Sequence, residues 1–355
     1  MVLYLIGLGL ADEQDITLKG LKAVQSCSKV YLESYTSIML VDDFQARMVR
    51  RLTYPQEALY GQPITLAHRE TVELEADEIL REAYEGNVAF LVVGDPLSAT
   101  THADLILRAR QFQAPGASAP TPVPVKIIHN ASITTALGSS GLAGYNFGQT
   151  VSIPFWSDDW RPDSWLARIG ENMALGLHTL CLSDIKVREQ SIEDMSRGRL
   201  RYQPPRYMLL PQLITQLLAA AREHQVDFLD PERTLAVALC RMGADDTATR
   251  RGELVRAGTL AEMLACTEPT EAQRQQDEQD DEAFEEANPT VSEKEMEARR
   301  EARRVKRAVD FWGEPLHSLV LVGRQLHPME VEYGRSLALP GSRWAQVARD
   351  VYGTH

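Results

Sequence analysis

The chain has 355 residues, 44% of them hydrophobic and 25% charged, which fits a soluble globular protein of roughly two domains. A formal net charge of −13 argues against nonspecific nucleic-acid binding, because phosphate contacts need clusters of Lys and Arg. The four scattered cysteines form no CxxC pair, which fits a reducing cytosol and neither a disulfide framework nor a zinc site. The apolar start is too short for a signal peptide or a membrane-spanning helix, so we expect a cytoplasmic protein with no membrane partner.

The chain opens with a strand, a glycine loop, a helix and a second strand. We expect a buried strand over Val2–Ile6, the loop Gly7–Leu10, a helix from about Asp15 and a strand over Lys29–Leu32. This order indicates a nucleotide-like cofactor. It does not select NAD, because Asp12 stands where the dinucleotide fingerprint GxGxxG needs its third glycine.

Val88–Val93 is a run of six apolar residues that predicts a buried, parallel-type strand. It ends at the tight turn Gly94-Asp95-Pro96. Ligands bind at the carboxyl ends of strands in open α/β sheets, so Asp95 stands where a site is expected. The alternative is that its carboxylate only caps the following turn. We expect Thr100 or Thr101 to cap the helix Asp104–Gln111.

Ser132 follows a further expected strand, Val125–His129. Its hydroxyl is a favoured helix cap. The alternative is that Ser132 and the free N–H groups of the next helix hold a ligand carboxylate. Other helices and strands are expected at Glu70–Tyr84, Val151–Phe155, Trp165–Asn172, His178–Leu182, Leu213–Glu223, Thr234–Leu239 and Leu316–Val322.

These elements predict an α/β fold with an N-terminal domain over residues 1–148 and a C-terminal domain over 149–345. A charged insertion, disordered or helical, interrupts the second domain at about 267–311. Within it, Glu268–Ala287 has nine Asp or Glu against one Arg, which indicates a solvated, disordered block. Ser292 and Glu295 form a capping box that opens a charged helix over Glu293–Arg307 without a continuous apolar face.

Catalytic motifs of other classes are missing. The eight histidines show no HxxxH spacing and no carboxylate cluster, so no metal site is expected. No GxSxG nucleophile motif occurs either.

Several segments together resemble diphthine synthases, of the eukaryotic methyl-ester-forming branch, within the tetrapyrrole methylase superfamily. They are LYLIGLGLADEQDIT, VYLESYTS, FLVVGDPLSATTHADL, IIHNASI, TLCLSDIKV, PPRYM, RMGADD and EPLHSLVLVG. The resemblance runs in order from Val2 to about Glu330, apart from the loop Ala114–Pro124 and the acidic insertion. The GLGL and GDP turns occur across the superfamily, whereas HNASI, the WxxxWRP segment and LSDIKV indicate the diphthine branch.

The resemblance implies two α/β domains with S-adenosylmethionine in the cleft between them, in a homodimer. The substrate would be translation elongation factor 2 carrying a 3-amino-3-carboxypropyl-histidine. The amine would be methylated to a trimethylammonium and the carboxylate esterified, giving diphthine methyl ester and S-adenosylhomocysteine. By motif, the cofactor contacts would be Leu10, Asp95, Ser98, Ser132, Ile133, Ser183, Met242 and His317. The family often has Gly in place of Ser98 and Leu in place of Ser183, and both contacts are expected to use the backbone.

A sulfonium carries an activated methyl group, so no metal or covalent nucleophile is required; alignment of the reactants supplies several kcal/mol. The acceptor amine must be neutral, whereas its carboxylate is already a nucleophile, and the residues identify no general base. Lys186 and Arg188 follow the strand His178–Leu182 and are candidates to orient the acceptor carboxylate; the alternative is that they are solvated surface charges. Three other functions stay open: methylation of a tetrapyrrole or other small acceptor, a nucleotide-dependent oxidoreductase and a noncatalytic binding protein.

Overall fold

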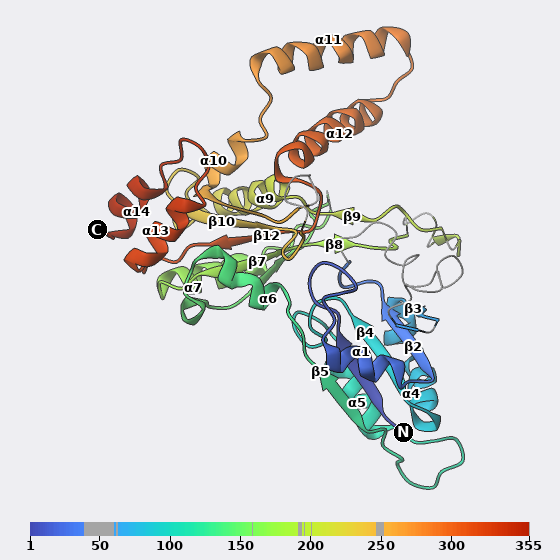
Figure 1. The fold of residues 1–355 in the computed structure, drawn as a ribbon. Helices are drawn as coiled ribbons and strands as arrows, with labels where there is room; N and C mark the ends of the chain where they lie inside the picture. The colour runs from blue at the N-terminus through green and yellow to red at the C-terminus, as the bar shows by residue number, and fades with distance from the viewer. Residues whose placement is uncertain are drawn as a thin grey trace. The chain divides into compact units, whose positions relative to one another are not determined.

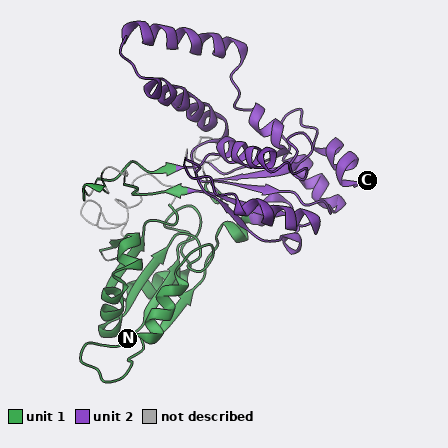
Figure 2. Ribbon diagram, turned by 180° about the vertical axis from the view of Figure 1, so that it is seen from behind, with its two compact units in different colours: residues 1–136, 185–206, 242–244 green, residues 137–184, 207–241, 245–355 purple. Residues whose placement is uncertain are grey.

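The structure is a computed structural model that describes residues 1–38, 60–61, 63–157, 159–190, 194, 196–199, 201–245 and 252–354. The chain forms two compact units (Figure 2). The first combines residues 1–136, 185–206 and 242–244, and the second combines 137–184, 207–241 and 245–355. The N-terminal segment of the first unit ends at Ala136. The sequence predicted a domain boundary after residue 148.

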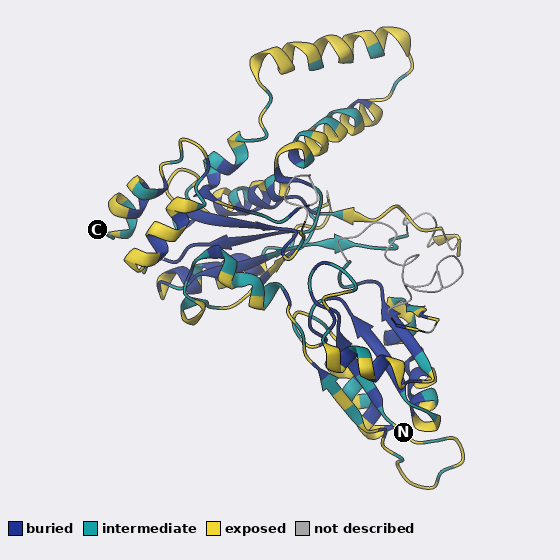
Figure 3. Cartoon of the chain, in the orientation of Figure 1, coloured by how far each residue is buried: buried dark blue, intermediate teal, exposed yellow. Residues whose placement is uncertain are grey.

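The first unit contains a five-stranded parallel sheet of order β3-β2-β4-β1-β5 (Figure 1). Every residue of its central strand β4 is buried, so the prediction of a buried parallel strand is confirmed (Figure 3). The edge strand β5 is only partly buried, because it has one neighbour in the sheet. The strands are β1 (Leu3–Gly7), β2 (Lys29–Glu33), β3 (Thr65–Ala67), β4 (Val88–Val92) and β5 (Val125–Ile128).

The helices of this unit differ from the expected ones in three details. The first helix begins at Leu18, after its cap Thr17, rather than near Asp15. The segment expected as one helix over Glu70–Tyr84 breaks at Leu74 and Glu75 into two helices. Neither Thr100 nor Thr101 caps the helix after the GDP turn, since its first flanking residue is His102 and the Thr100 hydroxyl donates to the Pro96 carbonyl instead. The helices are α1 (Leu18–Gln25), α3 (Arg69–Glu73), α4 (Ala76–Glu85), α5 (Ala103–Gln111) and α6 (Ile133–Ala136).

The second unit contains a five-stranded sheet of order β11-β10-β12-β7-β6, in which only β6 and β7 run parallel. Its strands are β6 (Val151–Ile153), β7 (Thr179–Ser183), β10 (Leu235–Cys240), β11 (Leu254–Thr259) and β12 (His317–Leu321). Its helices include α7 (Ser164–Ala174), α9 (Leu210–Glu223), α10 (Leu260–Ala265), α13 (Pro328–Ser336) and α14 (Trp344–Tyr352). A short ribbon pairs β8 (Ile185–Lys186) with β9 (Arg206–Tyr207), and residues 185–206 of it belong to the first unit.

The charged insertion folds as two helices, α11 (Glu271–Ala287) and α12 (Glu293–Trp312). The prediction of disorder over Glu268–Ala287 is therefore wrong, although α11 buries none of its residues (Figure 3). The acidic block is paired with the basic one: Asp281 binds Arg300 and Arg303, and Asp277 binds Arg303 and Arg307. Local composition revealed the charge of each block but not this complementarity.

Deleting Glu268–Arg307 and joining the ends with a short linker should leave the second unit folded. The main hydrophobic cluster of this unit includes Trp312 at the end of α12, which the deletion keeps, and no residue from the deleted range. Met296 is buried within the deleted range but lies outside this cluster. The entropic cost of closing a surface loop grows only slowly with its length, so shortening this one should change the free energy of unfolding little. Thermal unfolding and cofactor binding of the deleted protein are the measurements. A loss of cofactor binding would show that the insertion supports the functional part of the chain.

Candidate active site at the carboxyl ends of the first sheet

Strands β1, β4 and β5 end side by side, with Ile6 in register with both Leu91 and Ile128. The two glycine turns that follow are joined: the Gly94 N–H donates to the Gly9 carbonyl over 2.7 Å, and the Gly9 N–H donates back over 3.3 Å. Both residues have a positive φ, 89° at Gly9 and 78° at Gly94, which favours glycine. At Gly9 and Gly94 the edge of the sheet therefore presents backbone rather than side chains.

Asp95 lies at this edge and is 8% exposed. Its Oδ1 accepts from the Leu97 N–H at 2.9 Å, and its Oδ2 lies 2.7 Å from His129 Nδ1 and 3.2 Å from the Asn130 nitrogen. Burial raises the pKa of Asp95, but these hydrogen bonds outweigh burial and hold its pKa below the usual value. Asp95 therefore does cap its turn, as one interpretation expected, and is also an ionised group in contact with the residues that follow β5.

Three hydroxyl groups form a triangle beside this turn. Ser98 Oγ lies 2.6 Å from Thr134 Oγ1 and 3.2 Å from Ser132 Oγ, and the last two oxygens are 2.7 Å apart. The Ser132 hydroxyl thus bonds to hydroxyls rather than to the first N–H groups of α6. Thr134 was not singled out in the sequence, since a Thr in the first turn of a helix carries no distinctive signal.

Leu10 is held by a residue that the sequence marked only as a helix start. Asp15 Oδ2 accepts from the Leu10 and Ala11 N–H groups at 3.1 and 2.7 Å. The Asn130 side chain donates to the Asp15 and Gly7 carbonyls at 2.9 and 3.0 Å, which ties the glycine loop to the end of β5. Asp15 and Asn130 are therefore organising residues of the site. In the sequence, Asn130 could have been found from its place in the HNASI segment, and Asp15 from its carboxylate five residues after Leu10.

Met242 is part of the short segment 242–244, which belongs to the first unit. A Cβ on the next residue, Gly243, would lie 3.0 Å from the Leu10 Cβ. Leu10, Asp95, Ser98, Ser132, Ile133 and Met242 all lie in the first unit.

Ser183 and His317 lie together in the second unit, on adjacent strands β7 and β12. The Ser183 hydroxyl donates to the His317 carbonyl. The imidazole of His317 is fully engaged by the chain: Nδ1 accepts from the Leu210 N–H at 3.1 Å, and Nε2 lies 3.0 Å from the Glu314 carbonyl. Burial, followed by the charge of Arg241, lowers the pKa of His317 to about 3. The ring is therefore neutral and structural, and only its backbone is suited to a ligand contact.

Lys186 and Arg188 both have partners within the chain. Lys186 Nζ lies 3.0 Å from Glu189 Oε1, and the Arg188 guanidinium lies 4.1 Å from the centre of the Tyr202 ring. Arg188 has a φ of 59°, so the extended run ends before it and the two side chains do not follow strand alternation.

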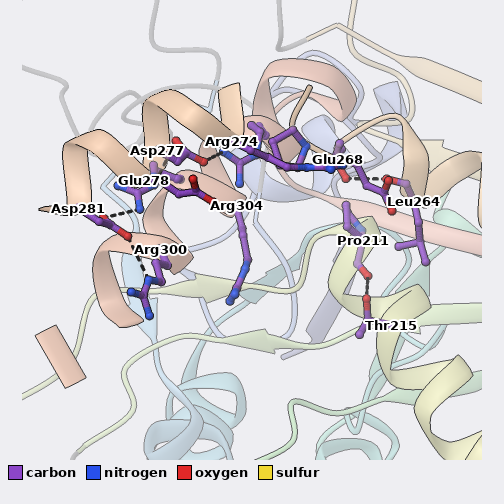
Figure 4. A pocket seen from close by; sticks show the side chains of 14 residues that line it. Pro211, Thr215, Leu264, Glu268, Arg274, Asp277, Glu278, Asp281, Arg300 and Arg304 are labelled. Atoms are coloured by element: carbon purple, nitrogen blue, oxygen red, sulfur yellow. Dashed lines mark hydrogen bonds and ion pairs between the residues drawn. The ribbon is translucent and has the colours of Figure 1, made fainter. Parts of the chain in front are cut away.

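A cavity of about 520 Å³ in the second unit is lined by α9, α10 and the two insertion helices (Figure 4). Its arginines are paired with carboxylates, as Arg300 is with Asp281 and Arg304 is with Glu297. Since these charges neutralise each other, the cavity has little excess charge to attract an ionic ligand.

Two features are absent from the described part of the chain. It contains no group of three or more His, Cys, Asp or Glu side chains placed to hold a metal ion. None of its helices is long and apolar enough to cross a membrane.

Comparisons with known proteins agree with these features. The family of Tetrapyrrole (Corrin/Porphyrin) Methylases matches residues 2–264. The diphthine methyl ester synthase of Mus musculus is 43% identical over 96% of this chain and 98% of its own length. The Homo sapiens protein of the same name is 43% identical, covering 96% of both chains. A solved structure described as a diphthine synthase from Entamoeba histolytica aligns with a TM-score of 0.66 at 33% identity, over 95% of this chain and 98% of that one. The chain belongs to the diphthine methyl ester synthases, within the tetrapyrrole methylase family.

Proposed function

We propose that this protein is an S-adenosylmethionine-dependent methyltransferase of diphthamide biosynthesis. It converts the 3-amino-3-carboxypropyl-histidine of translation elongation factor 2 to diphthine methyl ester, as a homodimer in the cytoplasm. The observation that carries the proposal is the 43% identity over 96% of the chain to a diphthine methyl ester synthase. The arrangement of polar groups at the strand ends supports it.

The strand-end groups fit this cofactor chemically. S-adenosylmethionine presents an ammonium group and ribose hydroxyls, and the ionised Asp95 and the hydroxyls of Ser98 and Ser132 are suitable partners for such groups. The backbone exposed at Gly9 and Gly94 allows a ligand to approach closely. We propose that the cofactor is held by Leu10, Asp95, Ser98, Ser132, Ile133, Ser183, Met242 and His317, the last through its backbone.

The bound cofactor would supply an activated methyl group. The chain's part is then to position the acceptor, to desolvate it and to leave its nitrogen unprotonated. Alignment alone is worth several kcal/mol in transfers of this kind. The acceptor carboxylate needs no deprotonation at neutral pH, whereas the amine does.

The test is methyl transfer from labelled S-adenosylmethionine to elongation factor 2 that carries the 3-amino-3-carboxypropyl group. We expect methyl groups on both the amine and the carboxylate by mass spectrometry, with unchanged rates after treatment with a chelator. Transfer to a tetrapyrrole but not to elongation factor 2 would favour the small-acceptor alternative. Binding of NAD in place of S-adenosylmethionine would favour an oxidoreductase, and cofactor binding without transfer would favour a binding protein.

The variant Lys186→Ala/Arg188→Ala tests whether these cations orient the acceptor. If they do, the KM for elongation factor 2 rises about tenfold, the loss expected for a charge-assisted contact, and cofactor affinity stays unchanged. The matched control is Arg168→Ala/Arg108→Ala, which removes two other exposed, paired cations. Equal effects of both double variants would assign Lys186 and Arg188 to the solvated surface.

A further inference from the structure

His129 directly follows β5 at the carboxyl edge of the first sheet. Its Nδ1 lies 2.7 Å from Asp95 Oδ2, and its side chain is 67% exposed while that of Asp95 is 11% exposed. One end of the imidazole ring is thus fixed against a buried carboxylate, and most of the ring faces outward.

The partner of Nδ1 decides which ring nitrogen carries the proton. Asp95 is ionised, because its pKa lies below the usual value, so its oxygens only accept hydrogen bonds. Nδ1 must therefore be the donor, and in the neutral ring the lone pair is on Nε2. No residue in the described part of the chain makes a hydrogen bond to that nitrogen. Asp95 thus fixes the orientation of the ring and leaves Nε2 as its acceptor nitrogen.

The proposed reaction needs such a group for only one of its two acceptors. An aliphatic amine is an ammonium at neutral pH and has no lone pair, whereas a carboxylate is already ionised. We propose that His129 Nε2 is the base that deprotonates the acceptor amine. The proton moves from the ammonium nitrogen to Nε2, the N–H electron pair stays on nitrogen, and the imidazolium returns its proton to water before the next transfer.

This assignment rests on the proposed function and gives His129 a role in methylation of the amine but not in esterification of the carboxylate. Two neighbouring residues connect His129 to the proposed cofactor site. Asn130, the next residue, bonds through its N–H to the same Asp95 oxygen, and Ser132 lies in the hydroxyl triangle. His129 is therefore within three residues of proposed cofactor contacts, on the same strand end.

The variant His129→Asn separates the two functions of the ring. The Asn amide can still donate to Asp95 from near the position of Nδ1, but it has no basic nitrogen. The matched control is His224→Asn. His224 also pairs with an aspartate, Asp163, but it follows helix α9 in the second unit and not a strand end.

Three quantities are measured for wild type and both variants. Affinity for S-adenosylhomocysteine comes from calorimetry. Nitrogen methylation is followed by mass spectrometry in single turnover on elongation factor 2 with the unmethylated side chain. Esterification is followed separately on elongation factor 2 that already carries the trimethylammonium and a free carboxylate, prepared by hydrolysing the ester of the wild-type product.

We expect His129→Asn to slow nitrogen methylation about a hundredfold, within the usual range for loss of a general base. Esterification and cofactor affinity should change less than about twofold, as should all three quantities in His224→Asn. Unchanged nitrogen methylation, or equal slowing of both reactions, would overturn the assignment. Failure of the proposed function is distinguishable, because the wild-type protein would then transfer no methyl group to either acceptor, and the assignment would fall with it.

Discussion

Asp95→Ala should weaken cofactor binding about ten- to a hundredfold, because a hydrogen bond to an ionised group is worth about 1.5–3 kcal/mol. Asp95 is the ionised side chain that follows β4 and contacts His129 and Asn130, the residues that follow β5. Calorimetry with S-adenosylhomocysteine measures the effect. Circular dichroism should show that the variant keeps its fold, since the sheet on which the turn stands has a fully buried central strand.

The control for Asp95→Ala is Asp104→Ala, which removes an exposed carboxylate paired with Arg108 in helix α5. Surface pairs of this kind are worth at most about 1 kcal/mol, and we expect normal cofactor affinity. If Asp95→Ala melts far earlier than the control while its folded fraction binds normally, Asp95 has only a structural role.

Acid should destabilise the protein already between about pH 6.5 and pH 5, before most carboxylates titrate. Burial lowers the pKa of His102, His178 and His317 below the ordinary value of 6.5. The unfolded chain therefore binds more protons than the folded one below that value, and stability falls as the pH falls. His317, whose pKa is lowered to about 3, contributes up to about 1.4 kcal/mol of lost stability per pH unit, and His102 and His178 add to the loss in the same direction.

One carboxyl group opposes this trend. Burial raises the pKa of Glu33, so its protonation favours the folded state as the pH falls. Urea unfolding at about pH 7 and about pH 5 measures the difference. His178→Gln should reduce stability at neutral pH, since His178 accepts from the Gly323 N–H and faces Glu330, and should make the pH dependence less steep. Stability that is constant over this interval would contradict the prediction.

The sequence predicted the elements whose signal is local. The apolar run at Val88–Val93 specified β4 because a central parallel strand is apolar on both faces. Strand β11 and helices α13 and α14 were not anticipated, although the apolar residues of α14 recur at helical spacing and Trp344, Val347 and Ala348 are buried. Disorder was predicted for the residues of α11 because their own composition is strongly acidic. The arginines that pair with these carboxylates belong to α12, a later segment of the chain.

The residues of the candidate site also divide into those with a local sequence signal and those that depend on tertiary structure. Asp95 could be predicted, since it directly follows the strand that positions it. Its contact with His129 could not, because the two residues are 34 positions apart and meet only through the pairing of both β4 and β5 with β1. The role expected of His317 also depended on tertiary structure. Both its ring nitrogens bond to residues of the chain, so a resemblance by motif cannot distinguish a side-chain contact from a backbone contact.

The chain passes between its two units five times, after residues 136, 184, 206, 241 and 244. No single cut in the chain can therefore separate the residues of one unit from those of the other. During synthesis on the ribosome the parallel sheet of the first unit can form once residue 136 has emerged, but its pieces 185–206 and 242–244 are made much later. Premature termination before Gly243 would leave Leu10 without the segment that packs against it, so a truncated product retains the sheet but not the complete loop environment.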